Sequence, residues 1–243
     1  MSSARPLAAR RRLKAEEFRL LRDLVNARAG LHFDDEALPS FERRLAERLV
    51  ALDLSGFDDY YNYLRFSARG EAELEEAIEA LTTNETYFYR QEYQLRGFRD
   101  ELLPQLAEEH RARRRLTVWS AGCATGEEAY TIAMFVHESG LFAGWDVRVI
   151  GSDISRRSVA TARRGVYRGG AFRAIPAAAR SAYFCEATGG ERVVDAIREM
   201  CHFGQLNLLD GARAAIVGRV DVVFCRNVLI YFDSRSRRQV IDN

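Results

Sequence analysis

The sequence is poor in the residues that build metal centres and disulfide frameworks. It contains four cysteines and four histidines among 243 residues, and no two cysteines stand in a Cys-x-x-Cys pair. Cys123, Cys185, Cys201 and Cys225 lie far apart, and several of them fall in expected buried strands. We therefore predict reduced core cysteines in a cytoplasmic protein, with neither a metal site nor disulfide bonds.

Long apolar runs and an excess of charge of one sign are also missing. There is no secretory segment and no apolar stretch long enough to cross a membrane, so we expect a soluble chain without direct membrane insertion. The 36 Lys and Arg residues nearly balance 35 Asp and Glu residues, which leaves a formal net charge of +1. This balance argues against nonspecific binding of nucleic acid by the protein as a whole.

What remains is the composition of an ordinary folded protein, with 47% hydrophobic and 29% charged residues. The length suggests one large domain or two small ones. Residues 1–85 have helical periodicity without strand-like alternation, and they predict an all-helical amino-terminal domain. Its apolar stripes are Phe18, Leu21, Leu24 and Val25, and then Leu38, Phe41, Leu45, Leu49 and Leu52.

The ends of these helices can also be predicted from the sequence. The first helix should end near Gly30, a third should start after Gly56, and a fourth should run from Glu71 to Leu81. A basic group on the second helix comprises Arg43, Arg44 and Arg48. We interpret it as a solvated face or as a docking surface for an acidic partner.

The most informative segment is residues 118–130, which predicts a buried strand, a Gly-x-x-x-Gly turn between Gly122 and Gly126, and the start of a helix. Nucleotide-like cofactors bind at such turns, because glycine lets the backbone turn beneath the ligand and the helix directs its partly positive end at it. Glu127 and Glu128 at the helix start would repel phosphate and attract a cation such as the α-ammonium of S-adenosylmethionine. The alternative is that these glutamates only complement the helix dipole.

Two later segments predict strands that end in polar residues. Residues 147–154 are apolar and β-branched and end in Asp153, about 27 residues beyond Gly126, near the offset of a ribose-binding acid. The alternative for Asp153 is an N-cap of the helix that begins near Ser155. Residues 220–227 predict another strand followed by polar residues. Three such strand ends indicate a cofactor crevice at one edge of a sheet.

From the helix predicted over residues 95–109 onward, strands and helices alternate, which is typical of a doubly wound parallel sheet. We therefore expect an α/β domain over residues 86–243. The alternation breaks over residues 168–204, where a short helix from Pro176 to Tyr183 precedes two short apolar segments around Gly189 and Gly190. This pattern predicts a small antiparallel β-subdomain inserted in the sheet, with its turn at the glycines.

Several motifs, in their order along nearly the whole chain, resemble the CheR family of chemotaxis receptor glutamate methyltransferases. The motifs are residues 81–90, 119–130, 151–154, 164–167, 203–209 and 224–232. The resemblance implies a Rossmann-like S-adenosylmethionine-dependent methyltransferase. It would form methyl esters on glutamates in the cytoplasmic helices of bacterial chemoreceptors, with S-adenosylhomocysteine as the product.

The resemblance also implies the residues of the site. Arg90 and Tyr231 would lie nearest the transferred methyl group. The cofactor site would comprise Asn84, Thr86, Arg90, Gly122, Glu128, Asp153, Asn207, Leu208, Arg226 and Asn227. The helical region would be the family's amino-terminal domain, and the inserted β-subdomain would be the part that tethers the receptor.

Four of these residues also have simpler structural interpretations. Arg90 could form a salt bridge with Glu85 or Glu92 on a helix surface. Tyr231 could be a core aromatic, and Asn84 could be a helix C-cap. Asn207 could tie its own loop backbone.

The chain departs from the family pattern in two ways. It stops at Asn243, where the family continues with further strands, so we expect carboxyl-terminal strands to be missing. The glycine turn of the β-subdomain is short, which puts receptor tethering in question. Two other functions remain open: a NAD-dependent oxidoreductase, disfavoured because Gly-x-Gly-x-x-Gly is absent, and a noncatalytic receptor-binding or regulatory module that keeps the fold.

Overall fold

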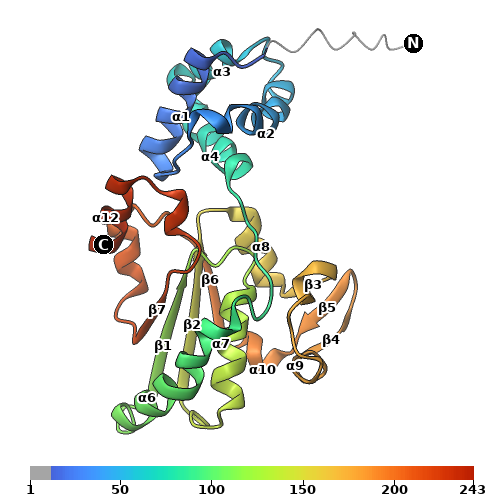
Figure 1. Ribbon diagram of the computed structural model, residues 1–243, viewed down its shortest axis with the longest axis vertical. Coiled ribbons are helices and arrows are strands. Elements are labelled where there is room, and N and C mark those ends of the chain that lie inside the picture. The colour runs from blue at the N-terminus through green and yellow to red at the C-terminus, as the bar shows by residue number, and fades with distance from the viewer. Residues whose placement is uncertain (1–11) are drawn as a thin grey trace. The chain divides into compact units, whose positions relative to one another are not determined.

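A computed structural model describes residues 12–243, so the first 11 residues of the expected helical domain lie outside the described part. The chain divides into two compact units. One unit contains the residues up to Thr83 together with Ile230–Gln239, and the other contains Asn84–Leu229 together with Val240–Asn243. Figure 1 shows the helices of the first unit and the sheet of the second.

The helical unit is built from four helices in its amino-terminal part: α1 (Ala15–Ala29), α2 (Leu38–Ala51), α3 (Phe57–Phe66) and α4 (Gly70–Leu81). A short 3-10 turn, η1 (Asp35–Ala37), precedes α2. The predicted helix ends agree closely with these bounds. Gly30 follows α1 in the left-handed conformation, with φ of 71°, which explains why α1 ends there.

The segment Ile230–Gln239 returns to this helical unit, which the sequence analysis did not predict. It contains the last two residues of η5 (Leu229–Tyr231) and most of α12 (Ser234–Asp242). The side-chain amide of Asn26 donates a hydrogen bond of 2.8 Å to the Asp233 carboxylate. These partners lie 207 residues apart, so only the tertiary fold brings them together.

The interior of the helical unit holds a buried polar group that corrects the interpretation of its arginines. Glu73 is 6% exposed and accepts hydrogen bonds from Tyr60 at 2.8 Å and from Arg48 at 2.8 and 2.6 Å. Arg44 donates to the carbonyl oxygen of Leu81 at 2.5 Å. Arg44 and Arg48 therefore join α2 to α4, and the interpretation of these two as a solvated or docking face was wrong.

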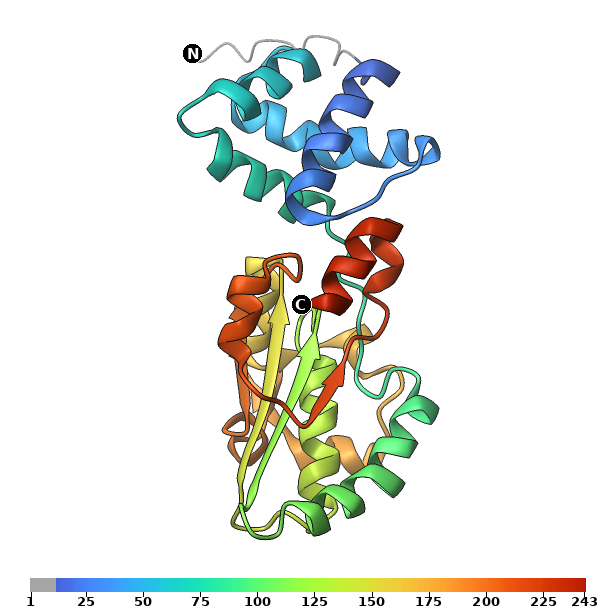
Figure 2. The same cartoon turned by 90° about the vertical axis from the view of Figure 1, so that its left-hand side faces the viewer.

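The second unit is built on a four-stranded parallel sheet with the order β6-β2-β1-β7. The strands are β1 (Arg115–Ala121), β2 (Asp146–Asp153), β6 (Cys201–Gln205) and β7 (Val222–Phe224). Figure 2 shows β2, β1 and β7 side by side with their arrowheads toward one end. The chain runs outward from β1 through β2 to β6 and then returns to β7 on the other side of β1. The predicted Rossmann-like fold class is confirmed.

The core of this unit lies on the face of the sheet that carries α7 (Glu127–Glu138). Residues 129–136 of α7 are buried all round, as expected of a helix covered on both sides. The same hydrophobic cluster includes Val118 and Val149 of the main sheet and Phe184 and Val193 of a smaller one. Helix α8 (Arg156–Arg164) follows β2, and the short helices α11 (Gly211–Ala214) and η4 (Ala215–Val217) precede β7.

The smaller sheet is antiparallel, with the order β3-β5-β4. Its strands are β3 (Val166–Tyr167), β4 (Phe184–Ala187) and β5 (Gly190–Val193), and η3 (Gly169–Phe172), α9 (Ala177–Tyr183) and α10 (Asp195–Arg198) accompany them. The antiparallel hairpin with its turn at the glycines was predicted correctly. However, it forms a separate sheet with a third strand, β3, and the last residues of the expected insertion form β6 of the main sheet.

The single helix expected over residues 95–109 is interrupted. The structure has α5 (Glu92–Gly97), a π-helical turn η2 (Phe98–Leu102) and α6 (Leu103–Glu109). Pro104 lies at the start of α6 and has no amide hydrogen to donate to the preceding turn, which accounts for a change of helix type at this point.

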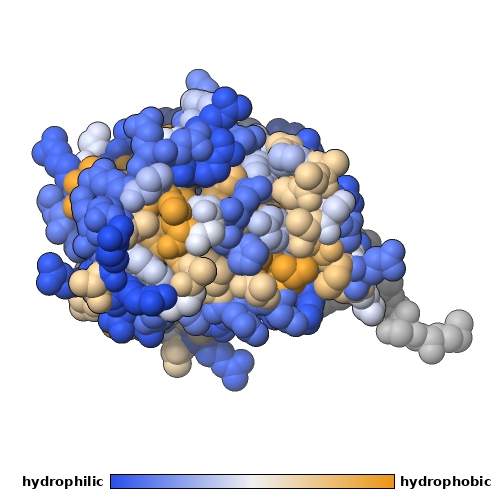
Figure 3. Space-filling model, turned by 90° about the horizontal axis from the view of Figure 1, so that it is seen from below, coloured by the Kyte–Doolittle hydropathy of each residue, from blue (hydrophilic) through white to orange (hydrophobic). Residues whose placement is uncertain are grey.

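The surface opposite the carboxyl ends of the strands is mainly hydrophilic, with apolar residues between the charged ones (Figure 3). A hollow there is lined by Pro104, Ala107, Glu108, Arg111, Arg114, Leu141 and Trp145. Within residues 12–243, no helix combines the length and the apolar character needed to cross a membrane.

Candidate cofactor and methyl-transfer site

The candidate site lies at the carboxyl ends of β1, β2 and β7. Strand β1 has β2 on one side and β7 on the other, so the chain reverses its direction of travel across the sheet at β1. Ligands of open α/β sheets bind at such a reversal, because the loops on its two sides diverge and leave a crevice. All three strand ends that the sequence analysis singled out therefore meet at one edge.

The loop after β1 is folded tightly against the end of β2. The amide groups of Gly122 and Cys123 both donate to the carbonyl oxygen of Ser152, at 2.7 and 2.9 Å. Gly122 has φ of +75°, and a Cβ atom on it would overlap the side chain of Val228. Gly126 has φ of +98°, and a Cβ there would lie 2.7 Å from Ala162. Both positions therefore require glycine for conformation and for space.

Asp153 ends β2 and is 7% exposed. Its carboxylate accepts hydrogen bonds from the amide of Ala124 at 2.8 Å and from the amide of Ser155 at 2.9 Å. The N-cap of α8 is Ser155, whose hydroxyl oxygen accepts from the amide of Ser158, so the capping alternative for Asp153 was wrong. Asp153 instead joins the glycine loop to the end of β2.

The two glutamates at the start of α7 have different environments. Glu127 is 4% exposed and accepts a hydrogen bond of 2.7 Å from the Thr125 hydroxyl. Glu128 accepts a hydrogen bond of 2.8 Å from Ser120 and forms an ion pair of 3.0 Å with Arg226. Burial raises the pKa of both carboxyl groups above the ordinary value, and the contacts with Ser120 and Arg226 oppose this rise at Glu128.

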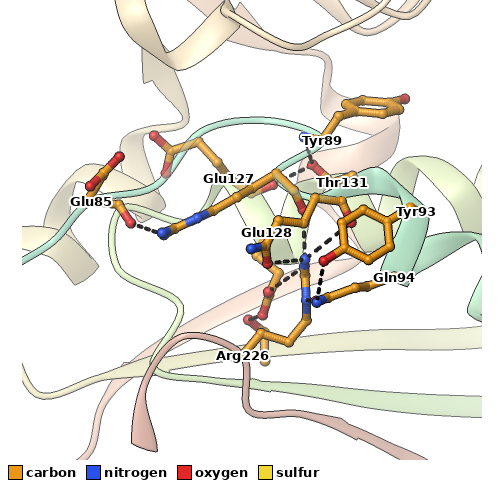
Figure 4. A network of polar contacts seen from close by, with 11 residues as sticks. Glu85, Tyr89, Tyr93, Gln94, Glu127, Glu128, Thr131 and Arg226 are labelled. Atoms are coloured by element: carbon orange, nitrogen blue, oxygen red, sulfur yellow. Dashed lines mark hydrogen bonds and ion pairs between the residues drawn. The ribbon is translucent and has the colours of Figure 1, made fainter. Parts of the chain in front are cut away.

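Arg226, just beyond β7, is the centre of the polar network in Figure 4. Besides Glu128, its guanidinium donates to the side-chain oxygen of Gln94 at 2.9 Å and to the carbonyl oxygen of Arg90 at 2.7 Å. Because Arg226 neutralises Glu128, attraction of a cation by the two glutamates is weaker than the sequence alone suggested. Interaction with the helix dipole alone does not explain the position of Glu128, because the side chains of Ser120 in β1 and of Arg226 after β7 hold it.

Arg90 lies in the segment that leads into α5. Its guanidinium donates to the carbonyl oxygen of Glu85 and lies 5.8 Å from the centre of the Tyr87 ring. The carboxylate of Glu85 pairs with Arg173 at 2.9 Å, and Glu92 lies 3.8 Å from Arg99. Glu85 and Glu92 therefore pair with other arginines, and the expected salt bridge of Arg90 with one of them was wrong.

Comparison with known proteins shows the family of the chain. The description "CheR methyltransferase, SAM binding domain" matches residues 84–243, and "CheR methyltransferase, all-alpha domain" matches residues 16–82. The chain belongs to the CheR methyltransferase family.

Individual CheR relatives are similar over most of the chain. It is 35% identical to chemotaxis protein methyltransferase 2 of Vibrio cholerae, over 93% of this chain and 79% of that protein. It is 33% identical to the chemotaxis protein methyltransferase of Escherichia coli, over 94% of this chain and 78% of that protein. It is 37% identical to the probable biofilm formation methyltransferase WspC of Pseudomonas putida, over 93% of this chain and 51% of that protein.

The cofactor of the CheR family is S-adenosylmethionine, and the residues at the strand ends fit it. Gly122 lets Val228 pack directly against the backbone of the loop, so the tight turn at the end of β1 is kept. Asp153 supplies a buried carboxylate and Glu128 a half-buried one, the acceptors that ribose hydroxyls and an ammonium group need. Among the described residues no cluster of three or more His, Cys, Asp or Glu could hold a metal ion.

The other CheR site residues proposed from the sequence lie as follows. Asn84 is two residues beyond the C-cap of α4, which is Thr82, so the C-cap alternative was wrong. Asn207 accepts a hydrogen bond of 3.0 Å from the amide of Leu209, which is the self-tied loop that the alternative described. Leu208 is buried beside Ala121 at the end of β1.

Thr86, Asn227 and Tyr231 complete the set. Thr86 is half-buried in the segment before Arg90. Asn227 follows Arg226 with a left-handed φ of 56°. Tyr231 belongs to the helical unit, where its carbonyl oxygen accepts from the amide of His32 at 2.8 Å, whereas Arg90 belongs to the sheet unit.

Sequence reasoning missed the residues that support this set. Ser120 orients Glu128, and Gln94 contacts Arg226. Thr131 accepts a hydrogen bond of 3.2 Å from the amide of Tyr89. Ser120 lies within the motif of residues 119–130. The contacts of Gln94 and Thr131 span 132 and 42 residues, so no local sequence pattern could have predicted them.

Proposed function

We propose that the protein methylates glutamate side chains on the cytoplasmic helices of bacterial chemoreceptors, with S-adenosylmethionine as the methyl donor, in adaptation to chemical stimuli. The observation that carries this proposal is the similarity, over more than nine-tenths of the chain, to proteins named chemotaxis protein methyltransferase. The reaction would take place in the cytoplasm, where these receptor helices lie.

The arrangement of the site suits this reaction. S-adenosylmethionine supplies a methyl group on a positively charged sulfur. The acceptor glutamate is already ionised near neutral pH, since an unperturbed glutamate has a pKa of about 4.3. No general base is needed, so the task of the chain is to align the carboxylate and to keep water from the reacting charges.

We assign the alignment to Arg90. A guanidinium can hold a carboxylate through two parallel hydrogen bonds, which fixes both its position and its plane. The Arg90 guanidinium donates to a backbone carbonyl oxygen rather than to a carboxylate, so an incoming glutamate does not have to displace an ion pair. Asp153 and Glu128 are assigned to holding the cofactor, and a role of Tyr231 near the transferred methyl group stays a prediction of the family resemblance.

The test of this proposal is the methylation rate of an Arg90→Ala variant with receptor fragments as substrate. We expect kcat to fall by roughly 10- to 100-fold, as for the loss of a hydrogen bond to a charged group, with a smaller change in affinity for S-adenosylhomocysteine. Arg90→Lys should restore little, because an ammonium group lacks the planar pair of donors.

Arg96→Ala is the matched control, since Arg96 is an exposed arginine of α5 in the same unit. It should methylate like the unmodified protein. Kinetics near the unmodified values in both Arg90 variants would remove Arg90 from the mechanism. An unmodified protein that binds cofactor but transfers no methyl group would instead support the noncatalytic alternative.

A further inference from the structure

The backbone around Arg90 is held in an unusual conformation. Tyr89 has φ of 61° and Gln91 has φ of 51°, so Arg90 lies between two residues in the left-handed region. This region is sterically unfavourable for residues with a Cβ atom, so the turn needs contacts that hold it. The direction in which the Arg90 side chain leaves the backbone depends on these contacts.

The amino-terminal side of the turn is anchored in the core. Tyr89 is 4% exposed, and its ring packs edge to face against Phe135 with a centroid distance of 5.2 Å. Its amide donates to the Thr131 hydroxyl, which in turn donates to the carbonyl oxygen of Glu127 at 2.7 Å. This side is therefore attached to α7 by packing and by hydrogen bonds.

The carboxyl-terminal side of the turn is held by Arg226. One terminal nitrogen of its guanidinium donates to the carbonyl oxygens of Arg90 at 2.7 Å and of Gln91 at 3.4 Å. The other donates to Glu128 at 3.0 Å. Arg226 thus contacts the turn and the Glu128 carboxylate at the same time, whereas Glu128 is also held independently by Ser120 at 2.8 Å.

The third nitrogen of the Arg226 guanidinium, Nε, donates to Gln94. The Gln94 side-chain oxygen accepts from it at 2.9 Å, and the Gln94 amide nitrogen donates to the Tyr93 hydroxyl at 3.1 Å. Gln94 is exposed on the surface of α5, so it contributes little to the packing of the unit. Its contact with Arg226 is therefore a specific one that can be removed without opening the core.

We propose that Gln94 is a positioning residue: by orienting the Arg226 guanidinium, it holds the left-handed turn that directs Arg90 into the site. The role of Arg90 in this inference rests on the proposed function. The role of Gln94 in holding the turn rests on the contacts alone and can be measured without cofactor or substrate.

The experiment compares three variants of the full chain. Gln94→Leu removes the acceptor, Gln94→Glu keeps an acceptor oxygen, and Gln105→Leu makes the same apolar change at an exposed residue of α6. Amide hydrogen exchange, read by mass spectrometry on the peptide covering residues 88–97, reports the opening of the turn. Methylation kinetics on receptor fragments report the consequence for Arg90.

We expect Gln94→Leu to speed exchange in that peptide by roughly three- to tenfold and to lower kcat by a similar factor, while the KM for S-adenosylmethionine and the melting temperature stay unchanged. Gln94→Glu and Gln105→Leu should behave like the unmodified protein. In an Arg90→Ala background, Gln94→Leu should cause no further loss of kcat, because both changes act through the same side chain.

Unchanged exchange in Gln94→Leu would overturn the inference, and so would a kcat loss that is equally large in the Arg90→Ala background. If the unmodified protein shows no methyl transfer, the proposed function fails. The exchange rates then decide the structural role of Gln94 by themselves: faster exchange confined to residues 88–97 supports it, and unchanged exchange refutes it.

Discussion

At the scale of single residues, we propose two tasks for the Asp153 carboxylate. Its oxygens accept from the amides of Ala124 and Ser155, which ties the glycine loop to the end of β2. A carboxylate can accept about four hydrogen bonds, so backbone amides and ribose hydroxyls can share one carboxylate. The residue therefore shapes the cofactor loop even before a ligand arrives.

Asp153→Ala should weaken the binding of S-adenosylhomocysteine by about 1–3 kcal/mol, because both a ligand acceptor and a loop contact are lost. Isothermal titration calorimetry measures the dissociation constant directly. Asp153→Asn is the companion variant, since its amide oxygen can keep one of the two loop contacts. An unchanged dissociation constant in Asp153→Ala would reduce Asp153 to a structural residue.

Gly122 is the second residue whose identity is set by its surroundings. Gly122→Ala should destabilise the protein by about 1–3 kcal/mol, because alanine is strained at φ of +75° and its methyl group would overlap Val228. We expect a lower melting temperature and weaker binding of S-adenosylhomocysteine.

Gly204→Ala is the control for Gly122→Ala, since a Cβ on Gly204 in β6 would have no atom within 4 Å. A double variant with Val228→Ala separates the two causes, because it removes the overlap and leaves the backbone strain. Melting and binding of Gly122→Ala equal to those of the unmodified protein would contradict this account of the loop.

At the scale of elements, the start of α7 combines a favourable and an unfavourable effect. Acidic residues in a first turn complement the helix dipole, but Glu127 is buried, and burial raises the pKa of its carboxyl group above the ordinary value of 4.5. The folded state therefore favours the protonated carboxyl group more than the unfolded state does.

This difference predicts how stability depends on pH. A raised pKa in the folded state contributes stability below pH 4.5, and the contribution is lost as the pH rises through the raised value. Glu127→Gln should therefore gain stability relative to the unmodified protein as the pH rises above 4.5, by at most about 1.4 kcal/mol per pH unit. Urea denaturation between pH 4 and pH 7 measures it, and a difference that is constant over this range would contradict the assignment.

At the scale of the whole molecule, binding of the cofactor should appear as a gain in the free energy of unfolding. A ligand at 100 times its dissociation constant stabilises the folded state by about 2.7 kcal/mol. S-adenosylhomocysteine should therefore raise the melting temperature of the full chain. NAD should not, because the loop lacks Gly-x-Gly-x-x-Gly and places Glu127 and Glu128 where a pyrophosphate would bind.

Thermal melts with each ligand over a range of concentrations make this comparison. S-adenosylhomocysteine and NAD both contain an adenosine. A difference between their shifts in melting temperature therefore tests the glycine loop and the start of α7. Equal stabilisation by both ligands would contradict the assignment of the crevice to S-adenosylmethionine.

Local sequence determined much of this protein. Apolar periodicity and capping residues located the end of α1, the start of α3 and both ends of α4 to within a residue or two, since helix ends depend on neighbours such as Gly30. The run of β-branched residues before Asp153 and the glycine turn after β1 indicated the edge of the sheet that carries the candidate site, because each signal is contained within a few neighbouring residues. The family motifs added the identity of the cofactor.

The tertiary structure decided the rest, because the deciding contacts join residues far apart in sequence. The pairing of Glu128 with Arg226 spans 98 residues, and that of Gln94 with Arg226 spans 132. Strand β3 has only two residues, too few for any periodicity, and it exists because β5 supplies its hydrogen-bond partners. The return of Ile230–Gln239 to the helical unit likewise depends on partners such as Asn26, which no local pattern can specify.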